Sequence, residues 1–350
     1  MKKWRLRLVA AGAVAALAAF GAMTASAGPQ RAARPSATTV NFQLSFFANA
    51  QHVGYLVASH RGYYGKAGLN VKVKPGGPTV EPTLLLAQGT VDIAQVDFPA
   101  FLQAVAKGAP MTYIGLTYQQ DPIDYVALKS TPLSSPADLK GKTFGQQQAG
   151  PLDPELLAML DKAGLTQSDI KIVPIGFTID DLLNGKCNVF PSRIFFHPAE
   201  FENAGIHYPE GLNILDPNKL GVAVASQGLA VNNNYLKKHP QAVVNFLRAS
   251  LKGWWFAIGN PRQAVEDVES FIPKGASNPQ DDFVDTKTTN QIVTHTASGK
   301  LIRNILGLPM DYLNTSQNIL FKYEVVKKKL VLTKYVNTKL IEQARAKPLK

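Results

Sequence analysis

The chain has 350 residues, a formal net charge of +12, 45% hydrophobic residues and one cysteine, Cys187. A single cysteine excludes an intrachain disulfide framework, and the length predicts two lobes rather than one core. The basic residues form no stripe with interleaved aromatic residues, so the composition does not favour nucleic-acid binding. We expect a monomer.

The first 27 residues are typical of a signal peptide. Basic residues precede an apolar run over residues 8–20, and an Ala-x-Ala cleavage site ends at Ala27. Cleavage there lowers the net charge to +8, because four basic residues and no acidic ones are removed. Residues 28–39 are predicted to form a flexible linker. We therefore expect an exported chain, in the periplasm or on the outer face of the cytoplasmic membrane. No cysteine follows the apolar run, so a lipid anchor is not expected; an uncleaved N-terminal anchor is the alternative.

Residues 40–122 are expected to form the first part of lobe I. Alternating apolar residues predict strands, and glycines mark the helix ends. The expected strands are 40–46, 69–74, 91–94 and 111–117, and the expected helices are 53–60, 80–88 and 99–107. Residues 95–98 are expected to be a turn. This alternation is typical of an α/β lobe.

Residues 123–228 are expected to form lobe II. The expected strands are 125–129, 143–145, 170–174, 187–190, 212–215 and 223–231, and the expected helices are 135–142, 154–163 and 179–183. Residues 229–350 are predicted to be mainly helical, with helices at 235–258 and 261–271, to pack back on lobe I and to end in a basic tail. We expect the chain to cross between the lobes near residues 117–125 and 225–232.

Two segments repeat each other about a hundred residues apart: Leu84–Phe101 and Asp181–Phe201. Each has a leucine-rich helix end, a glycine (Gly89 or Gly185), a short apolar strand and a Pro-Ala pair before a phenylalanine. Such repeated units predict two similar lobes, and small ligands bind in the clefts between lobes of this kind.

The sequence carries no recognisable enzyme motif. It has no G-x-S-x-G, H-E-x-x-H or P-loop segment, and its histidines lack metal-ligand spacing. Cys187 lies in an apolar strand and is predicted to be a buried, inert thiol. We expect neither a cofactor nor a metal.

The loops at the predicted strand ends combine aromatic, amide and charged side chains. Aromatic faces and neutral amides suit a planar heterocycle, whereas a sulfonate or nitrate would want cationic or backbone N–H donors. About half of these aromatic residues would serve ordinary core packing. The candidate ligand-binding residues from these loops are Phe47, Asp97, Phe98, Tyr118, Gln147, Arg193 and Phe196.

Four segments carry a family resemblance. Residues 49–71 resemble an N-x-x-H-x-G opening followed by G-Y-F and G-L-D-V, and residues 86–94 resemble L-A-x-G-x-V-D-I-G. Residues 135–142 are similar to S-P-x-D-L-K-G-K, and residues 238–249 to x-N-P-x-x-V-x-x-F-L-R-A. Together they resemble the periplasmic binding proteins of the thiamine-pyrimidine type, which are related to nitrate, sulfonate and taurine binders.

The resemblance implies an α/β fold of the two-lobed periplasmic binding protein type (type II), with a two-strand hinge and a ligand cleft between the lobes. It also implies that Asn49, His52 and Glu200 lie at the ligand. The second repeat has Asn188 where the family usually has Asp, which puts the identity of the ligand in question.

The leading hypothesis is a solute-binding protein that delivers a small aromatic heterocycle, such as a pyrimidine precursor of thiamine or a flavin-like ring, to the permease and ATPase of an ABC importer. A binder of alkanesulfonate, taurine or nitrate with the same fold is one alternative. A pyrimidine-synthase-like enzyme is another, although the C-C-C-F-C motif of the fungal synthases is absent.

Overall fold

The computed structural model describes residues 37–147, 152–273, 278–296 and 300–349. The predicted signal peptide and most of the predicted linker lie outside these residues. Ala37–Lys350 forms one compact unit. Within the described ranges, no helix combines the length and the apolar character needed to cross a membrane.

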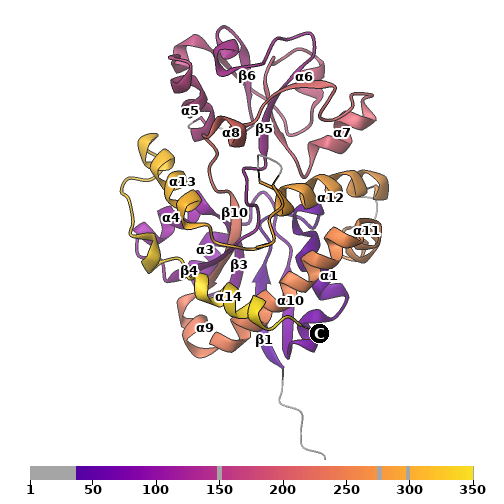
Figure 1. The fold of residues 1–350 in the computed structure, drawn as a ribbon, viewed down its shortest axis with the longest axis vertical. Helices are drawn as coiled ribbons and strands as arrows, with labels where there is room; N and C mark the ends of the chain where they lie inside the picture. Colours follow the sequence, from indigo (N-terminus) through magenta and orange to yellow (C-terminus); the bar gives the residue numbers. More distant parts are fainter. Residues whose placement is uncertain (1–36, 148–151, 274–277, 297–299, 350) are drawn as a thin grey trace, which may run out of the picture. The chain divides into compact units, whose positions relative to one another are not determined.

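Five strands form the first sheet. Their order is β2 (Leu69–Lys74), β1 (Thr38–Gln43), β3 (Ile93–Asp97), β10 (Gln227–Asn232) and β4 (Met111–Leu116). β1 runs parallel to β2 and β3, whereas β10 runs antiparallel to β3 and β4. Figure 1 shows β10, which comes late in the chain, beside the early strands. The first sheet therefore combines strands that lie far apart in the sequence.

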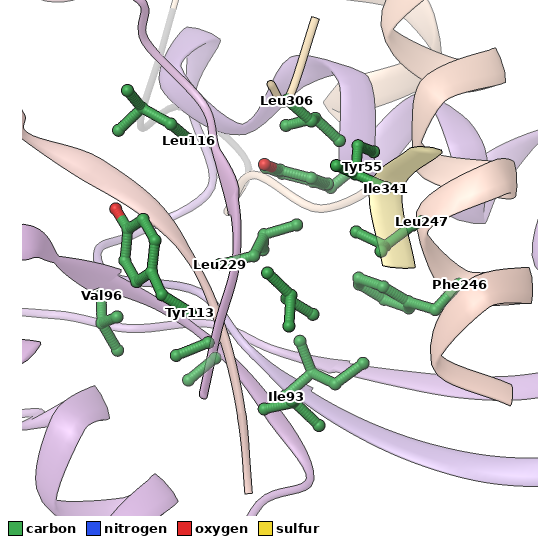
Figure 2. Packing of buried hydrophobic residues seen from close by; sticks show 14 of the residues in the cluster. Tyr55, Ile93, Val96, Tyr113, Leu116, Leu229, Phe246, Leu247, Leu306 and Ile341 are labelled. Atoms are coloured by element: carbon green, nitrogen blue, oxygen red, sulfur yellow. The ribbon is translucent and has the colours of Figure 1, made fainter. Parts of the chain in front are cut away.

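Helices cover both faces of this sheet, which explains why its strands are so apolar. On one face Phe42 of β1 packs edge-on against Tyr55 of α1 (Val53–His60) and Phe246 of α10 (Pro240–Gly259), with ring centres 5.4 and 4.9 Å apart. On the other face Tyr113 of β4 contacts Phe98 and Phe101 of α4 (Phe98–Ala106). Figure 2 shows part of this buried core. We call the elements around this sheet the first lobe.

The remaining helices of the first lobe come mostly from the last third of the chain. They are α2 (Tyr63–Lys66), α3 (Pro82–Ala87), α9 (Asn233–Lys238), α11 (Pro261–Glu269), α12 (Pro279–Thr294), α13 (Met310–Lys322) and α14 (Thr338–Ala346). α10 crosses α1 so closely that a Cβ atom on Gly253 would lie 2.0 Å from the carbonyl oxygen of Gly54. Only glycine fits at this crossing.

Two smaller sheets form the second lobe. One is antiparallel, in the order β8 (Phe190–Arg193), β5 (Ile123–Leu128) and β9 (Leu212–Leu215). The other pairs β6 (Thr143–Gln146) with β7 (Lys171–Pro174) in parallel. The accompanying helices are α5 (Pro154–Lys162), α6 (Asp180–Leu183), α7 (His197–Asn203) and α8 (Pro217–Leu220).

The chain passes between the two lobes at residues 117–122 and 221–226, and Asp121 joins these crossovers. Its carboxylate accepts hydrogen bonds from the backbone N–H of Ile123 (3.0 Å) and of Val224 (3.5 Å). The side chain of Asn218 bonds both the N–H and the carbonyl of Asp121. Burial raises the pKa of Asp121 to about 7, and the carboxyl of Glu155 is its hydrogen-bonding neighbour.

Several predicted boundaries were wrong. Residues 95–97 are strand rather than turn, and the strand expected at 187–190 is β8, Phe190–Arg193. In both places the apolar residues begin before the strand forms its regular backbone pairing with a neighbouring strand. The apolar run therefore predicts that a strand is present but not where it begins. The strand expected at 223–231 likewise begins only at Gln227.

Two predicted helices were also wrong. The helix expected at 135–142 is a single 3₁₀ turn, Pro136–Leu139, with a capping box between Ser135 and Asp138. The helix expected at 235–258 is broken at His239, because Pro240 begins α10 and has no N–H to continue α9.

Candidate functional site

The two repeats end their strands on opposite charges. Asp97 is the last residue of β3, and Arg193 is the last residue of β8. Each comes eight residues after the glycine of its repeat, Gly89 or Gly185, and both glycines have positive φ angles of 72° and 71°. The repeat therefore places an acid from the first lobe and a base from the second at equivalent positions.

Arg193 is held in place by its neighbours. Its guanidinium donates to the Oε1 atom of Gln147 and lies 6.0 Å from the ring centre of Phe177. Its backbone N–H donates to Nδ1 of His197 at 2.7 Å, so Nε2 of that ring carries the proton and donates to the carbonyl of Phe177, also at 2.7 Å. Burial lowers the pKa of His197 to about 3, so this imidazole is neutral.

Carboxylates surround Arg193 from both lobes. Desolvation raises the pKa of Asp97 and of Asp153, and in each case the charge of Arg193 opposes this shift. Desolvation lowers the pKa of Arg193, and Asp153 and Asp97 are the two strongest opposing charges. The Asp97 side chain is exposed to solvent even though protein atoms desolvate it, which is the environment of a recess rather than of a convex surface.

These two aspartates are not used for helix capping. Asp97 precedes α4 and Asp153 precedes α5, yet neither side chain accepts a capping hydrogen bond. An N-cap aspartate ordinarily accepts from the first turn of its helix. The carboxylate of Asp97 therefore remains available to Arg193 or to a ligand, while that of Asp153 also accepts a hydrogen bond from the hydroxyl of Tyr125 at 3.4 Å.

The loop after β1 carries a polar cluster that reaches the second lobe through Tyr118. Asn49 caps the 3₁₀ helix Ala50–His52 by accepting from the N–H of Gln51. The hydroxyl of Tyr118 donates to the carbonyl of Gln51 at 2.9 Å, and its ring stacks on Phe195 with centres 5.7 Å apart. Since Phe195 belongs to the turn after Arg193, this stack joins the first lobe to the second.

Exposed aromatic rings accompany these polar groups. Phe46 and Phe47 of the first lobe are 38% and 51% exposed, and Phe177 and Phe196 of the second are 52% and 37% exposed. Large aromatic side chains usually bury most of their surface. Together with Asp97, Arg193 and Gln147, they provide ring faces for stacking and both donors and acceptors for a ring edge.

Four predicted site residues lie elsewhere or are covered: Phe98, Glu200, His52 and Tyr118. Phe98 is completely buried in the core of the first lobe, where it packs on Tyr113, so its prediction as a cleft residue was wrong. Glu200 lies on α7 and accepts from the N–H of Ile179, in a group with other carboxylates rather than with Asn49 and Asp97. It was placed at the ligand on sequence position alone.

His52 has no exposed surface. Its Nε2 atom lies 2.9 Å from the side-chain amide of Gln51, and burial lowers its pKa to about 3, opposed by hydrogen bonds to Gln95 and to the backbone of Phe47. Tyr118 is also completely buried. In this conformation both support the loop, and their predicted contact with a ligand stays a prediction.

Asn188 has a structural explanation. Asp92 in the first repeat accepts from the backbone N–H of Asn41 on β1, at 2.7 Å, and Asn188 in the second accepts from that of Thr143 on β6, at 3.0 Å. Both side chains fix the approach of the strand to its neighbour, and an amide oxygen does this as a carboxylate does. The exchange of Asp for Asn is therefore no sign of an altered ligand.

A cavity of about 910 Å³ is lined in part by Ile194, the residue that follows Arg193. It is formed by α12 and by β9, α7 and α8 of the second lobe, and none of the ten predicted site residues lines it. Its charged lining residues are mostly acidic, and none of these acidic residues lies within either of the two repeated segments. We therefore place the candidate site at the ends of β3 and β8, where opposite charges and aromatic rings converge.

Neither the thiol nor the imidazole described near this site is free to act as a nucleophile. Cys187 is buried, as predicted, and burial raises the pKa of its thiol to about 11, so it is not a thiolate at neutral pH. Both nitrogens of His197 are engaged. Within the described ranges, no three His, Cys, Asp or Glu side chains are arranged to hold a metal ion.

The sequence analysis missed Asp153, Phe177 and the support that His197 gives to Arg193. Asp153-Pro154 and Asp97-Phe98-Pro99 both place an aspartate before a proline that starts a helix. That shared pattern could have identified Asp153. No local signal marks Phe177, because its role depends on the turn that brings it to Arg193.

A family model described as NMT1/THI5 like matches residues 49–264. The chain belongs to the NMT1/THI5-like family. This confirms the resemblance of the opening loop and of the segments that follow it. The matched range includes Asp97, Arg193 and all the other predicted site residues except Phe47.

Known relatives of this NMT1/THI5-like chain include binding proteins and enzymes. It is 28% identical over 253 residues to the riboflavin-binding protein RibY of Chloroflexus aurantiacus, covering 71% of each chain. It is 26% identical to the formylaminopyrimidine-binding protein of Halalkalibacterium halodurans, covering 65% of this chain and 68% of that one. It is also 28% identical to the 4-amino-5-hydroxymethyl-2-methylpyrimidine phosphate synthase of Legionella pneumophila, covering 65% and 72%.

Solved structures confirm the fold. The chain is similar to the periplasmic sulfonate-binding protein SsuA of Methylobacillus flagellatus, with a TM-score of 0.65 and 14% identity over 89% of this chain and 94% of that one. The predicted α/β fold of the periplasmic binding protein type is therefore correct.

Proposed function

We propose that this NMT1/THI5-like chain is the extracytoplasmic solute-binding protein of an ABC importer and that it binds a small aromatic heterocycle between its lobes. Residues 40–122 and 229–350 would form one lobe and residues 123–228 the other. The protein would be exported without a lipid anchor and would act as a monomer, without catalysis.

The observation that carries this proposal is the convergence of Asp97 and Arg193 from equivalent positions of the two repeats. A ring with adjacent N–H and carbonyl groups can donate to the carboxylate and accept from the guanidinium at the same time. The aromatic side chains of both lobes can stack on its faces. A pyrimidine or a flavin-like ring has this chemistry, and relatives in the family are named for riboflavin and for formylaminopyrimidine.

The charge around Arg193 argues against the sulfonate alternative. An anionic solute would gain one guanidinium but would meet the carboxylates of Asp97 and Asp153. Like charges in a desolvated recess repel strongly. The synthase alternative finds no nucleophile in Cys187 or His197, because Cys187 is a buried thiol and both ring nitrogens of His197 are hydrogen-bonded. The carboxylates of Asp97 and Asp153 are the bases that this alternative would have to use.

Isothermal calorimetry on the purified protein tests the proposal. The panel contains pyrimidines, thiamine and riboflavin on one side, and an alkanesulfonate, taurine and nitrate on the other. We expect saturable heat with at least one heterocycle and none with the anions. Heat with the anions alone, or turnover of a heterocycle detected by mass spectrometry after incubation with iron, would contradict it.

A further inference from the structure

A basic groove lies between α4 and the loop that follows α13. Its volume is about 410 Å³, and its lining includes the ammonium side chains of Lys107, Lys327 and Lys328 and no acidic residue. Positive charge gathered in a recess without a carboxylate attracts anions more strongly than the same charge spread over a convex face.

Side chains of α13 and α4 bind the backbone of this loop, residues 323–331, and hold it in place. Leu330 exchanges two hydrogen bonds with the side chain of Gln317 on α13, at 2.8 and 3.1 Å. The side chain of Gln103 on α4 donates to the carbonyl of Val325 at 2.9 Å, and Val326 is buried. The lysines are therefore presented by a fixed turn rather than by a free tail.

Most of these lysines have no acidic partner. Lys327 pairs with Glu324 at 3.2 Å, but no ion pair of the described residues includes Lys107, Lys328 or Lys329. Apolar side chains are exposed beside them. Phe321 is 41% exposed, with the ammonium group of Lys329 5.3 Å from its ring centre, and Val331 is 61% exposed.

We propose that this basic groove docks the protein on an anionic membrane surface, with lipid phosphates at the lysines and Phe321 and Val331 among the headgroups. Lysines that flank exposed apolar side chains suit the interface of an anionic bilayer, where the charge meets phosphates and the apolar groups leave water. An acidic protein surface could also pair with the lysines, and the vesicle assay below separates it from a membrane. Such docking would keep an exported chain without a lipid anchor near its membrane.

Flotation with lipid vesicles tests this proposal, with the chain beginning at Gly28 so that the whole compact unit is retained. We expect binding to vesicles of phosphatidylcholine with phosphatidylglycerol, release by salt, and no binding to phosphatidylcholine alone. The variant with Lys327→Gln, Lys328→Gln and Lys329→Gln should lose at least tenfold in partition coefficient. Phe321→Ser, which leaves the charge unchanged, should lose a smaller but measurable amount.

The matched control carries Lys171→Gln, Lys237→Gln and Lys238→Gln, three exposed lysines outside the groove that change the net charge equally. It should keep its partition coefficient within twofold. Equal losses in the two triple variants would show attraction by net charge alone and overturn the proposal. So would failure of the unmodified protein to bind the anionic vesicles, as expected if the groove serves an acidic protein. The assay needs no solute, so its outcome is independent of the proposed function.

Discussion

The two repeats share one arrangement of glycine, strand and terminal charge, but the first ends its strand on an acid and the second on a base. Up to the end of the strand they share four features at equivalent positions: a left-handed glycine, a buried apolar residue (Val91 or Cys187), a side chain that fixes the neighbouring strand, and a charged residue at the strand end. The last charge has the opposite sign in the two repeats. The comparison teaches that the pattern sets where a functional group stands, and that the identity of one residue sets what it does there.

After the strand the repeats diverge. In the first, α4 begins directly after Asp97, and Phe98 turns into the core. In the second, Ile194, Phe195 and Phe196 separate Arg193 from α7. This insertion supplies the ring that stacks on Tyr118 and the exposed ring of Phe196. The second repeat therefore adds aromatic rings to its charged residue, and the first contributes a carboxylate at the start of a helix.

Replacing the charge of the second repeat should have the largest effect. Arg193→Gln removes the guanidinium and leaves Asp97 and Asp153 without their opposing charge. We expect the affinity for the heterocycle to fall by about 100-fold, or roughly 3 kcal/mol, as for other partly buried charged partners. Calorimetry on this variant and on Lys171→Gln, an exposed control, measures the loss. Unchanged affinity in Arg193→Gln would remove Arg193 from the site.

The support behind Arg193 should matter next. His197→Asn cannot bond both the Arg193 N–H and the Phe177 carbonyl, so we expect a loss of about 2 kcal/mol in unfolding free energy. The folded pKa of His197, about 3, lies below its unfolded value of 6.5, so its contribution is complete above pH 6.5 and is lost as the pH falls toward 3.

The difference between the unmodified protein and this variant should therefore shrink below pH 6.5, by up to about 1.4 kcal/mol per pH unit. Urea denaturation at neutral pH and at pH 5 measures it. A difference that grows on acidification would mean that the imidazole is protonated in the folded protein.

The smallest expected effect is on ligand affinity, and it should differ between Asp97 and Asp92, the two carboxylates of the first repeat. Asp97→Asn should weaken heterocycle binding by about tenfold, because an amide accepts a hydrogen bond from a ring N–H less strongly than a carboxylate. Asp92→Asn removes the same charge but should leave the affinity unchanged, since Asn188 performs the equivalent structural task in the second repeat. Equal losses in the two variants, measured by calorimetry, would show that charge near the site matters and position does not.

The fold was predictable because its signals are local or repeated. Alternating strands, glycine stops and the repeated segment indicated two α/β lobes, and Cys187 was expected to be buried. Strand ends were misplaced because an apolar run does not show where ladder pairing begins. At the site, loop composition predicted Asp97, Arg193 and Gln147, and their contact with a ligand stays a prediction. Phe98 was not distinguishable from an exposed aromatic residue, since only the packing of Tyr113 against it decides its direction.

The bond network of Asp121 limits how the two lobes can move. The carboxylate of Asp121 binds the N–H of Val224 in the other crossover, and the side chain of Asn218 at α8 binds the backbone of Asp121. If one crossover bent alone, some of these hydrogen bonds would break, and a buried polar group left without its partner costs free energy. We therefore expect the two crossovers to move together in any change of the angle between the lobes.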